Sequence, residues 1–259
     1  MINFKVLENH LIERILDEAF LLLEETGVEV QCDELIQRME KAGLPVNKET
    51  SRITFPRSVI EQSIASSPET IQLFDRSGTP FSKIGGNKTN FVPASSALNI
   101  LDWRTGERRT AQTADFIEYI KVADQAKHIS YPSTAFSTDD IPQDIADAWR
   151  LYMVMSYSNK PVVSGAFTHH RVPRMARMME CFRESQSEMT EKPMAVFTCC
   201  PNSPLRWGID SSHNLIDCVE KGIIVEVVPV LMIGLAVPVT TVGALVMQTA
   251  EVLSGVVFT

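Results

Sequence analysis

The stretch PMAVFTCCPNSPLRWGID, residues 193–210, decides how the rest of the chain is interpreted. Residues 194–200 are apolar or small and carry no charge, which is typical of a strand covered on both faces in a parallel sheet. Pro201 ends this strand because proline has no N–H for the ladder. Proteins with α/β folds bind ligands just beyond the carboxyl ends of parallel strands. The polar turn that follows, with Asn202 and Ser203, is therefore the first candidate for a functional site.

A strand–helix repeat extends outward from this stretch. Strand candidates begin near Asn90, Ile129, Pro161, Met194 and Ile223. Helical patterns lie between and after them, at 113–126, 141–156, 173–185, 210–221 and 239–258. A unit of about 30 residues is the signature of parallel βαβ architecture. An eight-fold (β/α) barrel takes about 250 residues, so the five units predict an incomplete barrel. An open sheet is the alternative, which we disfavour because it would leave an apolar edge strand exposed.

The part before the repeat is expected to be a mainly helical layer. Residues 7–26 and 33–42 read as amphipathic helices that end at Gly27 and Gly43, and Pro56 begins a third helix. We therefore predict an α/β protein with two parts. The first is an N-terminal helical layer, residues 1–88, and the second is the partial barrel, residues 89–259.

Composition narrows the function classes. The chain has 259 residues, a net charge of -8 and five cysteines, which argues against an electrostatic nucleic-acid binder. No CxxC pair and no signal peptide are present, so we expect a reduced, cytoplasmic protein. The uncharged stretch 227–247 is long enough to cross a bilayer. Pro229 and Pro238 interrupt it, and a buried strand, a loop and a buried helix are therefore expected instead of a membrane span.

Six stretches together resemble a known family, the trimethylamine methyltransferase superfamily. They are LEETGVEV (23–30), LDWRTGERRTAQTADF (101–116), DDIP (139–142), NKPVVSG (159–165), CPNSPLRW (200–207) and GLAVPVTTVGALVMQTAEVLSG (234–255). Each motif is weak by itself, whereas their order and spacing are specific. The resemblance covers essentially the whole chain.

The resemblance implies a fold and an activity. Members of this superfamily are TIM barrels that move a methyl group from a tertiary or quaternary amine, such as trimethylamine or glycine betaine, to the cobalt of a corrinoid. A separate small protein carries that cobalamin-type corrinoid, so this chain would bind no cofactor directly. Members are nearly twice this long, and those that carry pyrrolysine have it beyond residue 259. We therefore expect this chain to be the N-terminal part of a family member. The apolar strand at Ile223 would then be an unpaired edge of the sheet, which predicts a homo-oligomer.

Methyl transfer to cobalt needs few protein groups. The cofactor supplies the nucleophile, and a quaternary amine leaves neutral without a proton. Glu226, alone among apolar residues in IIVEVVPV, and Asn202 are the predicted catalytic residues. Glu226 must be paired or protonated in such a strand, and a pair with a lysine or arginine is favoured over a carboxylate that faces a cation. The predicted substrate-binding residues follow or end the strands: Ser203, Ser95, Gly165 and Thr198.

Several of these residues could instead have purely structural roles. Asn202 and Ser203 are weighed evenly between turn formation and substrate binding. Asp139 and Asp140 are expected to cap the helix that starts near Ile141. Zinc is disfavoured, because neighbouring residues of a strand point to opposite faces and only one of each pair, His169-His170 and Cys199-Cys200, would face a site.

Two functions other than methyl transfer are considered. One is a different barrel enzyme with a phosphate at a helix N-terminus, against which the lack of a glycine-rich phosphate loop counts. The other is a truncated or degenerate family member that acts at most as a binding protein.

Overall fold

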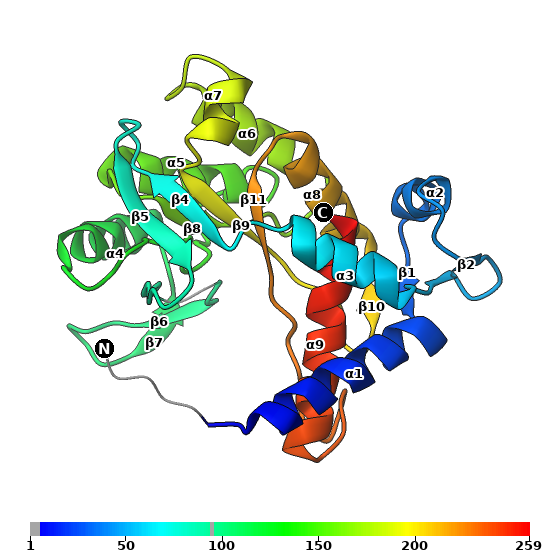
Figure 1. Ribbon diagram of the computed structural model, residues 1–259. Coiled ribbons are helices and arrows are strands. Elements are labelled where there is room, and N and C mark those ends of the chain that lie inside the picture. Colours follow the sequence, from blue (N-terminus) through cyan, green and yellow to red (C-terminus); the bar gives the residue numbers. More distant parts are fainter. Residues whose placement is uncertain (1–5, 94–95) are drawn as a thin grey trace. The chain divides into compact units, whose positions relative to one another are not determined.

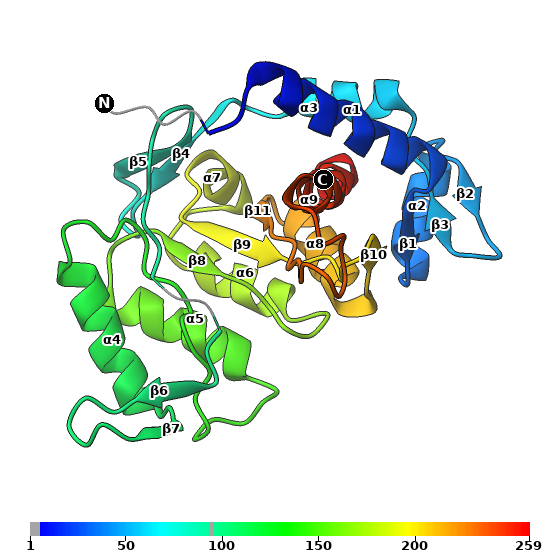
Figure 2. The ribbon, with the colours of Figure 1, turned by 90° about the horizontal axis from the view of Figure 1, so that it is seen from below.

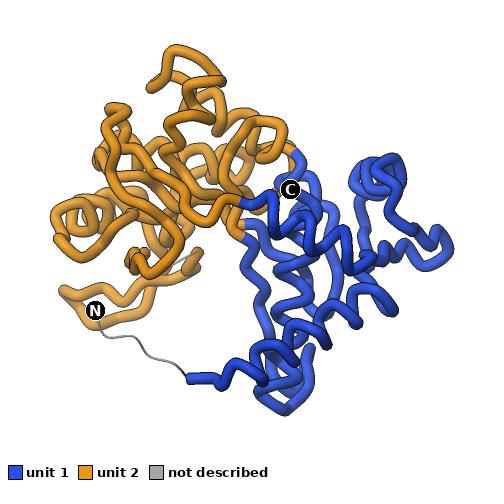
Figure 3. Tube along the Cα trace, viewed as in Figure 1, with its two compact units in different colours: residues 1–67, 199–216, 227–259 blue, residues 68–198, 217–226 orange. Residues whose placement is uncertain are grey.

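The computed structural model describes residues 6–93 and 96–259. The chain is a mixed α/β protein with two compact units, coloured separately in Figure 3. Unit 1 comprises residues 1–67, 199–216 and 227–259, and unit 2 comprises 68–198 and 217–226. These units group residues by proximity, so the division after residue 88 stays a prediction.

Unit 1 combines the first helices with the last one. Its helices are α1 (Asn9–Glu25), α2 (Asp33–Lys41), α3 (Arg57–Ser66) and α9 (Thr241–Phe258). Its strands β1 (Val28–Val30), β2 (Val46–Asn47), β3 (Arg52–Ile53) and β10 (Arg206–Trp207) form a sheet in the order β10-β1-β3-β2. The expectation of a mainly helical N-terminal layer missed this small sheet, because its strands have two or three residues and are too short to show a period.

Packing in unit 1 follows from the sequence. The apolar stripe of α1 buries Ile15, Ala19 and Leu23. α1 ends before Gly27, whose φ of +65° and close approach to the Ile53 carbonyl leave no room for a Cβ atom. Among the described residues, α9 is the one helix that is long and apolar enough to cross a bilayer, judged by length and composition alone. It packs against α1 and α3 as a core helix of the unit.

Unit 2 contains two hairpins and a parallel sheet flanked by helices. The hairpins are β4 (Thr70–Phe74) with β5 (Pro80–Gly85) and β6 (Asn99–Leu101) with β7 (Arg108–Thr110). The helices are α4 (Thr113–Gln125), α5 (Ala146–Tyr157), α6 (Val172–Glu180) and α7 (Gln186–Glu191), and α8 (Ile209–Glu220) runs across both units. α5 packs against α4, α6 and strand β8 (Val162–Ser164), as Figure 2 shows.

The central sheet of unit 2 has the order β11-β9-β8, with β9 (Ala195–Cys199) between β8 and β11 (Ile224–Val227) (Figure 1). β8 and β9 are parallel, with Val162 opposite Ala195, so the predicted parallel pairing of the strands at Pro161 and Met194 is confirmed. Apolar residues of this sheet belong to a hydrophobic core that includes Phe116, Leu151 and Phe197.

Two expected strands are wrong in detail. The segments near Asn90 and Ile129 are not regular strands, because prolines 93 and 132 remove ladder donors. Isolated parallel bridges remain there, Ala97 with Phe136 and Ser133 with Val163. The described residues form no closed barrel. The five predicted helices of the repeat are present, and the one expected from Ile141 begins at Ala146 instead.

Candidate functional site at the end of the parallel sheet

Three of the predicted site residues come together where the strands of unit 2 end. Thr198 is the fourth residue of β9 and Glu226 the third of β11. The Thr198 hydroxyl Oγ1 donates a hydrogen bond to Oε1 of Glu226. Glu226 is half-buried, and among the described residues its partner is this hydroxyl and not a lysine or arginine. The ion pair favoured from the sequence is therefore wrong for the described residues, because none of their lysines or arginines forms an ion pair with Glu226.

Gly165 follows β8 directly and lies against β9. A Cβ atom at this position would come within 3.0 Å of the Thr198 carbonyl oxygen. That spacing is tighter than nine in ten real Cβ contacts, so glycine lets the loop after β8 run close to the strand that carries Thr198. This close approach is to a neighbouring strand, and the substrate-binding role of Gly165 stays a prediction.

A buried ion pair, which no pattern in the sequence predicts, lies beneath the same loop. Arg150 and Asp147, both on α5, are 2% and 4% exposed. Nη2 of Arg150 donates to Oδ1 of Asp147 at 2.7 Å, and Nη1 donates to the Thr134 carbonyl at 3.1 Å. The other Asp147 oxygen, Oδ2, accepts the backbone N–H of Phe167 at 3.0 Å. Burial lowers the pKa of Arg150, and the charge of Asp147 opposes that shift.

The turn with Asn202 and Ser203 belongs to unit 1 and is closed by its own hydrogen bonds. Oδ1 of Asn202 accepts the Gly208 N–H at 3.0 Å, which fixes the start of α8. The Ser203 hydroxyl donates to Oε2 of Glu251 at 2.7 Å, and the Leu205 N–H donates to Oε1 of the same carboxylate at 2.8 Å. Glu251 is fully buried on α9. These contacts supply the turn-forming role, and a substrate role for Asn202 and Ser203 stays a prediction.

The structure shows few contacts for the remaining candidate residues. Ser95 lies outside the described residues. Cys199, the last residue of β9, is buried, and Cys200 after it is exposed. The His169 and His170 rings pack edge to face at 5.0 Å. Within 6–93 and 96–259, no three His, Cys, Asp or Glu side chains are grouped to hold a metal ion.

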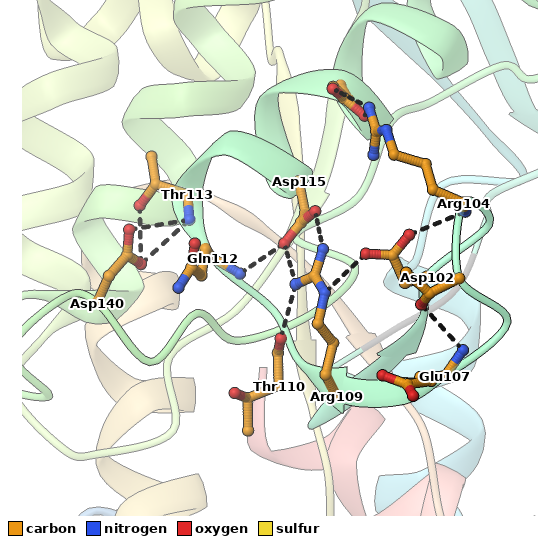
Figure 4. A network of polar contacts seen from close by, with 11 residues as sticks. Asp102, Arg104, Glu107, Arg109, Thr110, Gln112, Thr113, Asp115 and Asp140 are labelled. Carbon is orange, nitrogen blue, oxygen red and sulfur yellow. Dashed lines mark hydrogen bonds and ion pairs between the residues drawn. The ribbon is translucent and has the colours of Figure 1, made fainter.

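The stretch 101–116 builds a network of charges, drawn in Figure 4. Arg109 donates two hydrogen bonds of 2.8 Å to Asp115 and one of 2.9 Å to Asp102. The Arg109 bonds hold the pKa of Asp115 below its ordinary value. The Arg104 N–H and then Arg109 lower the pKa of Asp102. The network ties hairpin β6–β7 to the start of α4, which is a structural role.

The turn at residues 139–142 completes this network and corrects one expectation. Asp140 accepts hydrogen bonds from the N–H and hydroxyl of Thr113, and Asp139 accepts the Thr110 hydroxyl. Burial acts to raise the pKa of Asp140, but the hydrogen bonds from Thr113, Thr138 and the Asp140 backbone together outweigh it, and the pKa lies below its ordinary value. Both aspartates therefore serve the β7–α4 junction and do not cap α5, which starts only at Ala146.

Comparison with known proteins explains why these motifs occur in one chain. The family model described as trimethylamine methyltransferase (MTTB) matches residues 1–259. The chain belongs to this family. A trimethylamine methyltransferase of Desulfitobacterium hafniense is 23% identical, covering 91% of this chain and 48% of the relative. A glycine betaine methyltransferase from another strain of that species is 24% identical over 98% of this chain and 53% of the relative.

A third relative is named for another betaine. The proline betaine:corrinoid methyltransferase of Eubacterium limosum is 23% identical over 96% of this chain and 52% of the relative. The chain thus spans about half the length of the curated relatives it matches. Trimethylamine and betaine enzymes match at similar identity, so identity alone does not choose a substrate.

Proposed function

We propose that this protein moves a methyl group from a tertiary or quaternary amine, trimethylamine or a betaine, to the cobalt of a corrinoid carried by a partner protein. Membership of the family supports the class of reaction. The observation that carries the proposal is the Glu226 carboxylate, which is held by the Thr198 hydroxyl near the end of a parallel sheet. A half-buried carboxylate without a basic partner in the described chain attracts a cation, and a methylated ammonium is one.

The chemistry fits a site with few polar groups. The corrinoid, when bound by its partner, supplies the nucleophile. The residues of this chain then have to hold the N-methyl group in line for transfer and exclude water. Glu226 would face the ammonium, Thr198 would fix the carboxylate, and Gly165 would leave room for the substrate. Asn202 and Ser203, in the turn of unit 1, are proposed separately as residues that contact the substrate.

A partial (β/α) barrel is the proposed architecture around this site. Its support is the order of parallel neighbours: Ala97 next to Phe136, Ser133 next to Val163, and β8 next to β9. Consecutive right-handed βα connections produce such an order. In a barrel, the ends of these strands would meet at one face, where ligands bind.

Cellular setting and assembly complete the proposal. The free cysteines support a reduced, cytoplasmic environment. Exposed apolar side chains of residues 230–239, such as Val230, Leu235 and Val239, support a homo-oligomer. Sedimentation at several concentrations tests this, and a monomer at all of them would refute it. The second candidate function is a binding protein without transfer activity, which the calorimetry below distinguishes from an enzyme.

The decisive experiment follows the conversion of Co(I) to methyl-Co(III) by absorbance. Free cob(I)alamin and the corrinoid partner are each tested with trimethylamine, glycine betaine and carnitine. Calorimetry of the same substrates separates a binding protein, which binds without transfer, from an enzyme. Glu226→Gln and Asn202→Ala should lower the rate on the best substrate, whereas Glu13→Gln on the exposed side of α1 should not. Unchanged rates in both site variants, with the fold intact, would show that these residues are structural.

A further inference from the structure

The buried pair Arg150–Asp147 makes contacts that a helix does not need for its own stability. Both residues lie on α5, but their hydrogen bonds go to two other segments: the one that bridges β8 at Ser133, and the loop that follows β8. Thr134 follows Ser133, which bridges to Val163 of β8, and Phe167 lies in the loop after β8. One ion pair therefore joins the ends of two adjacent parallel segments.

The same pair also fixes the side chain of Phe167. The Arg150 Cζ lies 4.5 Å from the centroid of the Phe167 ring, a cation–π contact. Phe167 is 54% exposed, so Arg150 holds a side chain that lies at the surface. Phe167 is thus held twice, by its N–H on Asp147 and by its ring on Arg150.

The loop between β8 and Phe167 contains Gly165, which lies against Thr198. The order of contacts therefore runs from the ion pair to Phe167, along two residues to Gly165, and from there to Thr198 and Glu226. Buried ion pairs add little net stability relative to apolar replacements, because their desolvation offsets their attraction. Nε of Arg150 even lacks a hydrogen-bond partner in the described chain. Stability is thus a weak reason for this arrangement.

We propose that Arg150 and Asp147 are positioning residues that fix the Gly165–Phe167 loop against the strand carrying Thr198, and so set the shape of the substrate site. The inference rests on the proposed methyl transfer at Glu226 and deepens it. Neither residue touches the substrate. Their effect reaches the site through the backbone of the loop, where a displacement of about 1 Å is enough to slow a reaction severely.

The test separates positioning from stability with a charge-neutral double variant. Asp147→Leu with Arg150→Met removes both charges together, and apolar replacement of a buried pair often leaves stability unchanged. We expect thermal unfolding close to that of the wild type, amide hydrogen exchange at residues 165–168 at least about tenfold faster, and kcat/KM for methyl transfer about tenfold lower. Unchanged exchange and unchanged kcat/KM in a folded double variant would overturn the proposal.

A surface variant keeps the proposal testable if the double variant does not fold. Phe167→Leu removes the ring but keeps the N–H on Asp147, and Phe167→Tyr restores the ring. The first should speed exchange in the loop and lower kcat/KM, and the second should rescue both. Phe182→Leu is the matched control, because Phe182 is also half-exposed and stacks on an arginine, Arg76, at 5.7 Å. An equal effect of Phe182→Leu, or no effect of Phe167→Leu, would contradict the inference.

The hydrogen-exchange measurement does not depend on activity. If the wild-type protein transfers no methyl group from any amine, the proposed function fails while loop exchange still decides whether the ion pair fixes the loop. If the wild type is active and the double variant is equally active with a protected loop, the positioning role alone fails.

Discussion

Thr198 on β9 donates its hydroxyl hydrogen to the carboxylate of Glu226 on the neighbouring strand β11. These two residues are 28 positions apart in the sequence. One strand–helix unit separates them, so the spacing of the repeat brings the hydroxyl and the carboxylate side by side. The Thr198 hydroxyl is thus a neutral hydrogen-bond donor to the half-buried Glu226 side chain.

Thr198→Val is expected to remove that partner while keeping the shape of the side chain. Loss of one hydrogen bond costs about 1 kcal/mol of unfolding free energy, and methyl transfer should fall by more than this loss of stability explains. Urea unfolding and the cobalt absorbance assay measure the two effects. Thr198→Ser keeps the hydroxyl and should retain most activity. Equal rates for valine and serine would remove Thr198 from the site.

Acid should weaken the anchoring of hairpin β6–β7. The pKa of Asp115 is lowered in the folded protein, mainly by the Arg109 hydrogen bonds. A lowered folded pKa means that this stabilisation is complete above the ordinary aspartate pKa, about 3.9, and is lost as pH falls through the folded value. Asp115→Asn should therefore lower stability at neutral pH and flatten its decline below pH of about 4.

The control for this pH dependence is Asp144→Asn. The Asp144 side chain is exposed, so its replacement should leave the curve of unfolding free energy against pH unchanged. Denaturation at several pH values between neutral and strongly acidic conditions gives that curve. If Asp115→Asn and the wild type lose stability in parallel on acidification, the ion pair with Arg109 is not what acid disrupts.

Lys160→Met is expected to destabilise unit 2. The ammonium Nζ donates to the carbonyls of Ala123, Ala126 and Ile129 at 3.0, 3.0 and 2.9 Å, which closes the end of α4. Hydrogen bonds from charged groups contribute about 1.5–3 kcal/mol, so a loss of about that size is expected. Lys127→Met, at an exposed lysine near the same helix end, is the control and should stay within about 0.5 kcal/mol. A similar cost for both lysines would contradict a capping role.

Glu251→Ala should disturb the turn that carries Asn202. The change leaves the Ser203 hydroxyl and the Leu205 N–H without their acceptor, at about 1–3 kcal/mol for each group that stays buried. Glu251→Gln keeps an acceptor for Leu205 and an amide beside Ser203, so a smaller loss is expected. Thermal unfolding compares the two variants. A glutamine variant as unstable as the alanine variant would show that the charge matters more than the hydrogen bonds.

The sequence by itself determined the elements and the neighbours along the repeat. An uncharged run such as 194–200 has to be covered on both faces, which is why a strand in a parallel sheet was predictable and why β9 lies between β8 and β11. Apolar spacing located the helices of the repeat within a few residues of their observed ends. The errors fell where prolines near 93 and 132 break ladders and where strands have only two or three residues.

Only the tertiary structure decided the partner of each polar group. Glu251 looks like any glutamate on an apolar helix, yet it accepts hydrogen bonds from a turn 48 residues away. Asp140 was expected to cap the helix after it and instead holds the start of α4, 27 residues before it. Periodicity records which side of an element faces the core. It carries no information about which distant donor a buried carboxylate meets, because that depends on how the elements pack.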